Sequence, residues 1–212
     1  MRKILFVAFN GLAVILFNLN YLSLQANEKT DDSTNHQLTF RAKKTDLWIK
    51  NSSLVEEKKD DDFIEVELPG ELYESPKQVL EITKKEINRN TLEGIVASVF
   101  SANKAADLKW IVDNFVDEEK AKTKSLFKNK QILKESQADA QGIRGRYIKG
   151  QVEYKDYIIV FIEEDYPRGK KVTEALTCKK TREGWKVTNA LASDETYDVV
   201  FAALATGDVL AK

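Results

Sequence analysis

Histidine and cysteine, the side chains of many nucleophilic and metal-binding sites, each occur once in this 212-residue chain, as His36 and Cys178. His36 follows a polar stretch, residues 31–35, that is typical of a fraying chain end, so no catalytic triad is expected to depend on it. A zinc site with several histidine or cysteine ligands is excluded by count. The acidic run Asp60-Asp61-Asp62 follows two lysines and is interpreted as a solvated loop. We therefore predict no metal ion and no cofactor.

Signature motifs of common enzyme classes are also missing. The chain contains no G-x-S-x-G nucleophile motif, no phosphate-binding P-loop, no G-x-G-x-x-G dinucleotide motif and no EF-hand calcium loop. Hydrolase, nucleotide-dependent and calcium-dependent functions are accordingly not predicted, and no catalytic residue is assigned.

Cys178 cannot form an intramolecular disulfide, because the chain has no second cysteine. Alternate residues of a strand lie on the same face, and Cys178 shares this parity with Val172 and Leu176. The pattern therefore predicts a strand with the thiol buried on its apolar face. A reactive thiol, or one that pairs with another molecule, is the alternative.

Six aromatic residues could line a ligand pocket with apolar walls and polar tips. The simpler interpretation is that they fill the interface between helices and a sheet. The candidates for ligand binding are Trp110, Tyr147, Tyr157 and Trp185, and the group also includes Tyr154 and Phe161.

Residues 1–26 have the pattern of a secretory signal peptide. Arg2 and Lys3 precede an apolar run over residues 4–17, and a more polar stretch ends at Ala26. The run is shorter than the roughly 20 apolar residues of a membrane-spanning helix. We expect removal of residues 1–26 and a periplasmic or secreted protein, with a retained membrane anchor as the alternative.

The charged side chains nearly cancel, with 33 Lys and Arg against 34 Asp and Glu and a formal net charge of −1. This balance gives no general electrostatic reason to bind nucleic acid. The short basic clusters at residues 41–44 and 168–171 are flanked by acidic residues and are interpreted as solvated surface. Membrane contact is expected only if residues 1–26 are retained.

Two regions are expected after the signal. Residues 27–74 form a polar lead-in with short strands at 37–50 and 63–68, the second ended by Pro69-Gly70. Residues 75–212 form the main domain, in which Ser75-Pro76 has the residue types of a helix start. Helices are also expected from the Asn90-Thr91 cap, over 105–115 and over 117–128.

The second half of the main domain predicts strands joined by tight turns. They are expected at residues 131–138, 143–153, 157–164, 171–180 and 185–191. Residues 157–162 are apolar on both faces, which predicts a central strand covered on each side. A last helix starts at Ser193 and ends at Gly207. The fold class is α+β, with helices packed on a curved antiparallel sheet, extra N-terminal strands and a C-terminal helix.

Two short motifs within residues 91–191 carry a family resemblance. Residues 96–108 (VASVFSANKAADL) resemble the helix, A-x-x-x-x-D turn and second helix of the cone-shaped nuclear-transport-factor-2-like (NTF2-like) superfamily. Gly184-Trp185-Lys186-Val187 is similar to the G-x-W-x-V/I final strand of those domains. The resemblance implies a pocket between the concave sheet and the helices, a site that the superfamily uses for catalysis, ligand binding or protein association.

Enzymes of that superfamily that isomerise or dehydrate their substrates use an acid or base in the pocket. This chain offers no histidine there, which leaves Asp139, Tyr157 and Glu163 as carboxylate or phenol candidates. Their simpler interpretation is polar residues at strand ends or on the surface. Three hypotheses follow: an exported non-enzymatic domain that binds a small ligand or a protein, an isomerase or dehydratase, and a structural accessory of the cell envelope. A homodimer is left open.

Overall fold

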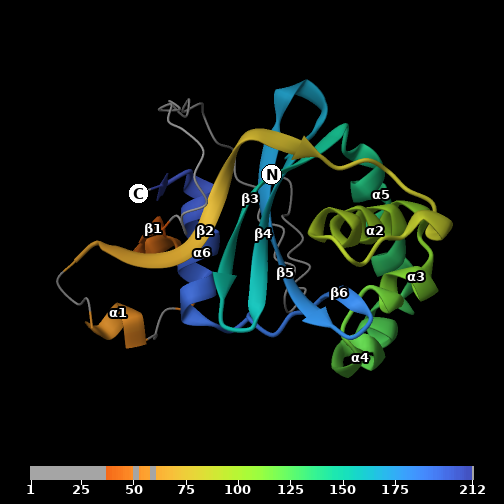
Figure 1. Ribbon diagram of the computed structural model, residues 1–212, viewed down its shortest axis with the longest axis horizontal. Coiled ribbons are helices and arrows are strands. Elements are labelled where there is room, and N and C mark those ends of the chain that lie inside the picture. Colours follow the sequence, from red (N-terminus) through yellow and green to blue (C-terminus); the bar gives the residue numbers. More distant parts are fainter. Residues whose placement is uncertain (1–36, 50–52, 58–60, 212) are drawn as a thin grey trace.

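The computed structural model describes residues 37–49, 53–57 and 61–211 (Figure 1). The predicted signal peptide, His36 and Asp60 lie outside these ranges. Within the described ranges, no helix combines the length and apolar character that crossing a membrane requires.

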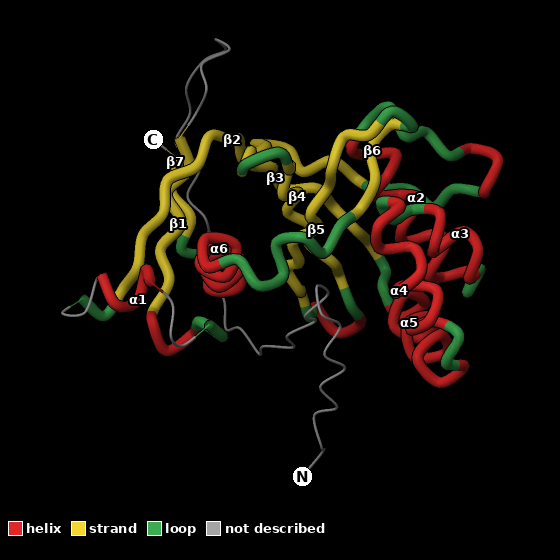
Figure 2. Tube along the Cα trace, turned by 90° about the horizontal axis from the view of Figure 1, so that it is seen from below, coloured by secondary structure: helices red, strands yellow, loops and turns green. Residues whose placement is uncertain are grey.

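One antiparallel sheet of seven strands organises the molecule, in the order β6-β5-β4-β3-β2-β1-β7. The strands are β1 (Gln37–Lys43), β2 (Phe63–Gln78), β3 (Gly145–Tyr154), β4 (Tyr157–Asp165), β5 (Lys171–Thr181), β6 (Gly184–Val187) and β7 (Val209–Ala211). The helices are α1 (Ser53–Glu57), α2 (Leu92–Ala105), α3 (Leu108–Asp113), α4 (Asp117–Phe127), α5 (Lys130–Gly142) and α6 (Glu195–Thr206). Helices α2 to α5 lie on one side of the sheet, and α6 lies on the other (Figure 2). The predicted α+β class, with N-terminal strands and a C-terminal helix, is confirmed.

The central strand β4 is apolar on both faces, as predicted, because each face meets a separate core. Ile159 and Phe161 are fully buried in the core shared with α6. Val160 and Ile162 are fully buried in the core shared with α2 and α3. Successive strand residues point to opposite faces, so parity along β4 decides which core a side chain enters. We call the two faces the α6-facing side and the helix-facing side.

Helix α2 begins where the sequence places it. The Thr91 hydroxyl accepts a hydrogen bond from the Gly94 amide at 3.1 Å, which satisfies one of the free amides at the helix start. The terminal helix α6 is capped by Asp194 instead of the expected Ser193, and it ends at Gly207 in a left-handed conformation with φ 76°. The predicted helix over 105–115 is shorter, because only Leu108–Asp113 is helical.

The prediction of a strand at 131–138 is wrong, because these residues lie inside helix α5. The Asn129 side chain caps this helix by accepting a hydrogen bond from the Gln131 amide at 3.0 Å. Ser136 then donates to Asn103 of α2 at 2.9 Å, and Gln137 donates to the Lys104 carbonyl at 3.3 Å. The segment is rich in good helix formers, and its contacts with α2 stabilise the helical form.

The prediction of a helix start at Ser75-Pro76 is also wrong, since both residues lie in β2. This strand continues through Pro69-Gly70 instead of ending there. Its first half pairs with β1, and its second half pairs with β3. Pro76 lies where the register with β3 shifts, between Leu72 and Lys77, where a proline removes no ladder hydrogen bond. Strand β2 thereby joins the residues before and after position 75 into one sheet.

Candidate functional site

A group of polar side chains lies on the helix-facing side, where β3 begins and β4 ends. Arg146 of β3 is directly opposite Glu164 of β4 in the strand register. Glu174 of β5 is opposite Ile162, so it points to the same side. Tyr166 follows β4, and Asp139 comes from α5 above the sheet. We call these five residues the Glu164 cluster.

An ion pair with little exposure to solvent forms the base of the cluster. Arg146 Nε lies 2.8 Å from Glu164 Oε1, and the two side chains are 12% and 1% exposed. The Arg146 guanidinium carbon also lies 4.0 Å from the centre of the Phe100 ring, a cation–π contact with helix α2. The remaining nitrogen Nη2 of Arg146 is buried and has no hydrogen-bond partner among the described residues.

Tyr166 joins two carboxyl groups with a single hydroxyl. Its oxygen lies 3.1 Å from Glu164 Oε2 and 3.2 Å from Asp139 Oδ1. A phenol donates only one proton, so the second contact is a hydrogen bond only when the carboxyl on that side is itself protonated. Burial raises the pKa of Glu164, while the Arg146 guanidinium and the Tyr166 hydroxyl oppose this shift. Burial and the carboxyl groups of Glu164 and Asp139 also raise the pKa of Tyr166, which keeps the phenol neutral.

Glu174 completes the cluster without a hydrogen bond or an ion pair to any described residue. Burial raises its pKa well above the usual value, and the neighbouring carboxyl groups of Glu164 and Asp139 raise it further. The carboxyl groups of Glu164 and Glu174 therefore share one guanidinium. The arrangement can hold a proton, donate or accept hydrogen bonds, or bind a cation, while no group of described residues has the ligands for a metal ion.

The structure brings one of the six sequence-predicted residues, Asp139, into this cluster. Tyr157 and Glu163 share the parity of Phe161 and lie on the α6-facing side, where Glu163 Oε1 is 2.7 Å from Lys171 Nζ. Tyr147 is opposite Glu163 in the register and lies on the same side. These three residues are thus separated from Asp139 by the sheet.

Trp110 and Trp185, the two tryptophans predicted to bind a ligand, lie on the helix-facing side, where they contact neighbouring elements of the fold. Trp110 is 4% exposed and donates its indole N–H to Ser98 Oγ at 2.8 Å. Ser98 in turn donates to Asn114 Oδ1 at 2.6 Å, so this network ties α3 to α2. Trp185 of β6 is half-buried, with Lys180 Nζ 5.0 Å from its ring centre.

Sequence reasoning missed Arg146, Glu164, Tyr166 and Glu174, although parity carried a signal for two of them. Glu164 shares the parity of Val160 and Ile162, and Glu174 shares that of Val172, Leu176 and Cys178. A charged residue in phase with a buried apolar row points into the core, where it requires a partner or a function.

Comparison with known proteins places limits on what the fold implies. No family model and no curated protein matches the chain. Among solved structures, the chain is similar to a protein from Campylobacter jejuni, described provisionally as an NTF2-like transpeptidase, at 18% sequence identity and a TM-score of 0.36. The match covers 46% of this chain and 97% of that protein. This likeness concerns about half of the chain and assigns it neither a family nor an activity.

Proposed function

We propose that the chain is an exported, non-enzymatic domain that binds a small polar ligand at the Glu164 cluster. Export is supported by the pattern of residues 1–26, in which a basic start precedes an apolar run. Binding is supported by the position of the cluster between the sheet and the helices, where charged side chains stand in otherwise apolar rows.

The observation that carries this proposal is the unused bonding capacity of two neighbouring groups. Arg146 Nη2 is buried without a hydrogen-bond partner among the described residues. Glu174, which is partly exposed, has no hydrogen bond to a described residue. A buried polar group without a partner costs about 1–3 kcal/mol. A ligand that offers an acceptor to Arg146 would remove this cost, and a positively charged or hydrogen-donating group on the same ligand would give Glu174 a partner. Small molecules with both an ammonium and an acceptor group, such as amino acids and amino sugars, fit this description.

A thermal-shift screen of amino acids, amino sugars and polyamines tests the proposal, followed by calorimetric titration of each hit. Glu174→Gln should weaken binding about tenfold or more, because a charge-assisted hydrogen bond is lost. Glu163→Gln is the matched control, since it removes a carboxylate from the α6-facing side, and it should leave affinity unchanged. A ligand whose affinity is insensitive to Glu174→Gln binds elsewhere and would refute this site.

A second candidate function, an isomerase or dehydratase, is favoured by the contacts of Tyr166. Its hydroxyl links Glu164 to Asp139, a chain that can pass a proton between the buried carboxyl and the exposed one. The residues involved differ from the predicted Tyr157 and Glu163. Proton exchange at a carbon of a bound ligand, followed in deuterated water by NMR, separates the two functions. An exchange rate that Tyr166→Phe abolishes while binding persists would establish the enzyme.

A further inference from the structure

Six lysines and no acidic residue occur between positions 120 and 134, across the end of α4 and the start of α5. Lys120 is paired with Asp117, the Nζ and Oδ1 atoms being 2.6 Å apart. The other five are exposed, and no carboxylate of the described residues lies in ion-pair contact with them. These five residues form what we call the lysine surface: Lys122, Lys124, Lys128, Lys130 and Lys134.

Several described lysines elsewhere have acidic partners, whereas the lysine surface gathers five lysines without one in a short stretch of chain. Lys77 pairs with Glu93 at 2.9 Å, Lys84 with Asp107 at 2.8 Å, and Lys171 with Glu163 at 2.7 Å. The nearly neutral total of −1 therefore conceals an uneven distribution of charge. A local excess of positive charge creates a field that the total charge does not reveal.

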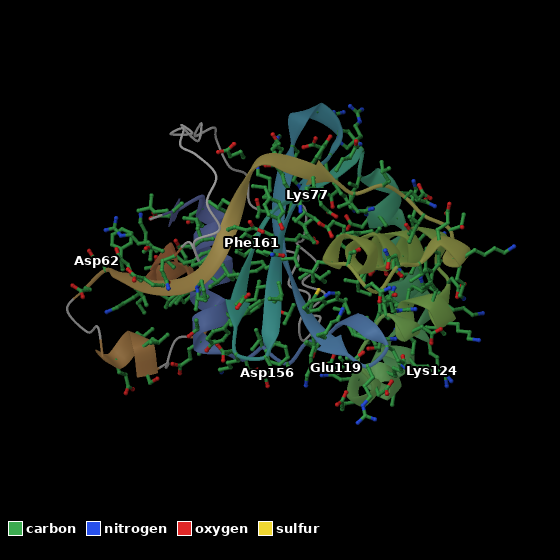
Figure 3. The ribbon with its side chains drawn as sticks, in the orientation of Figure 1. Asp62, Lys77, Glu119, Lys124, Asp156 and Phe161 are labelled. Atoms are coloured by element: carbon green, nitrogen blue, oxygen red, sulfur yellow. The ribbon has the colours of Figure 1, made fainter. Side chains whose placement is uncertain are left out.

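The lysine surface lies at one end of the molecule. Helices α4 and α5 are at the opposite end from α6 and β1 (Figure 2), and Lys124 points away from the body of the protein (Figure 3). Electrostatic interactions in solution fade over about 8 Å at physiological ionic strength. Screening therefore leaves little repulsion from the acidic residues of the far end.

The acidic residues of α4 and α5 at the near end are mostly engaged in other contacts. Asp117 is paired with Lys120, Glu119 accepts hydrogen bonds from Thr188 and Asn189, and Asp139 contacts the Tyr166 hydroxyl. The other acidic residues of these two helices are Glu118 and Glu135.

We propose that the lysine surface docks the domain on an anionic phospholipid bilayer. Lysine ammonium groups bind phosphate as point charges, without the geometric demands of an arginine fork. Each lysine near such a surface contributes to attraction, so five exposed lysines at one end of the molecule add to one another. Nucleic acid is the less suitable partner, because residues 120–134 contain no arginine, and Phe127, their only aromatic residue, is 5% exposed and cannot stack on a base.

Vesicle co-sedimentation of the full chain tests the proposal. Vesicles of phosphatidylcholine alone measure any binding by the apolar N-terminal segment, and an equimolar mixture with phosphatidylglycerol adds the anionic charge. We expect binding to the mixed vesicles to exceed this baseline, and the excess to fall about tenfold or more between about 0.01 M and 0.15 M salt. The quadruple variant K122Q/K124Q/K128Q/K130Q should reduce the excess to the baseline.

The matched control variant is K43Q/K85Q/K109Q/K180Q, which makes the same change in net charge at four lysines elsewhere. It should keep the excess binding within about twofold, since none of those residues belongs to the lysine surface. Equal losses in both variants would show that total charge, not this surface, governs attachment and would overturn the proposal. Binding that ignores phosphatidylglycerol would also overturn it, as would duplex DNA binding lost in the first variant without vesicle binding.

Discussion

At the scale of single residues, Glu174 ties the stability of the fold to pH. Its folded-state pKa is raised well above the usual 4.5. Below pH 4.5 the carboxyl is protonated in both states, but as pH rises the unfolded chain releases this proton first. The folded state then binds more protons than the unfolded one, so the free energy of unfolding falls until pH passes the folded pKa.

We therefore expect Glu174→Gln to be more stable than the wild type at neutral pH and to lose less stability as pH rises from about 4.5. Denaturant unfolding at a series of pH values measures the slope. Part of the fall should persist in the variant, because the pKa of Glu164 is also raised. Glu163→Gln serves as the control, and a slope in Glu174→Gln equal to that of the wild type would contradict the assignment.

Cys178 allows a second test at this scale. The residue is fully buried on β5, confirming the sequence prediction, and burial raises the pKa of its thiol to about 12. Thiolate is the reactive form, so the native protein should react with a thiol reagent far more slowly than the unfolded protein. Titration with and without denaturant gives the comparison. Rapid labelling of the native state, at the rate found in denaturant, would show that β5 opens freely.

The residues of the cluster were only partly predictable because β4 is apolar on both faces. Parity places Tyr157 and Glu163 on the opposite face of β4 from Glu164, but it does not say which face meets the larger group of helices. That choice depends on α6, which covers the side of Tyr157 and Phe161. Asp139 follows the segment 131–138 that the pattern predicts as a strand, but it reaches the cluster from helix α5.

At the scale of elements, the sequence predicted the segments whose apolar period was clear and failed where tertiary contacts decide. Helix α2 and strands β3 to β5 have unbroken patterns and were located correctly. Helix α5 has only a short apolar pair, Ile132 and Leu133, which fits either period, and its packing on α2 selects the helix. Strand β2 contains two prolines, whose turn signal is overridden by pairing with β1 and β3.

Asp198 joins helix α6 to the segment that follows β1. It is 1% exposed on α6, and it accepts hydrogen bonds from the backbone amides of Trp48 at 3.3 Å and Ile49 at 2.8 Å. Asp198→Ala would leave both amides without this acceptor and should lower the free energy of unfolding by roughly 3 kcal/mol. Denaturant unfolding measures the loss. Glu195→Ala, which removes an exposed acceptor of the Ser53 amide, should cost clearly less, and equal losses would contradict this role for Asp198.

At the scale of the whole molecule, two cores share one sheet. The α6-facing core gathers residues from both ends of the described chain, such as Phe40 and Val200, whereas the helix-facing core is built from the middle, such as Ile95 and Ile162. Phe40 and Phe161 pack edge to face with their ring centres 5.7 Å apart. Strands β3, β4 and β5 contribute side chains to both cores. Unfolding of one core therefore disrupts strands that also support the other core.

This sharing predicts a single cooperative unfolding transition, and the tryptophans lie where they can test it. Trp48 contacts Phe201 on the α6-facing side, with ring centres 5.1 Å apart, while Trp110 and Trp185 report on the helix-facing side. The variant Trp48→Phe therefore follows one face by fluorescence, and the double variant Trp110→Phe/Trp185→Phe follows the other. In each variant, the fluorescence and far-ultraviolet circular dichroism transitions should coincide.

Adding Phe161→Ala to each of these variants sharpens the test. Phe161 is fully buried on the α6-facing side, so its truncation should lower the free energy of unfolding by about 3–5 kcal/mol. If the two cores unfold together, the loss is the same whether Trp48 or the helix-facing tryptophans report it. A loss seen only by Trp48 would mean that the α6-facing core is an independent unit, and that the Glu164 cluster keeps its geometry without it.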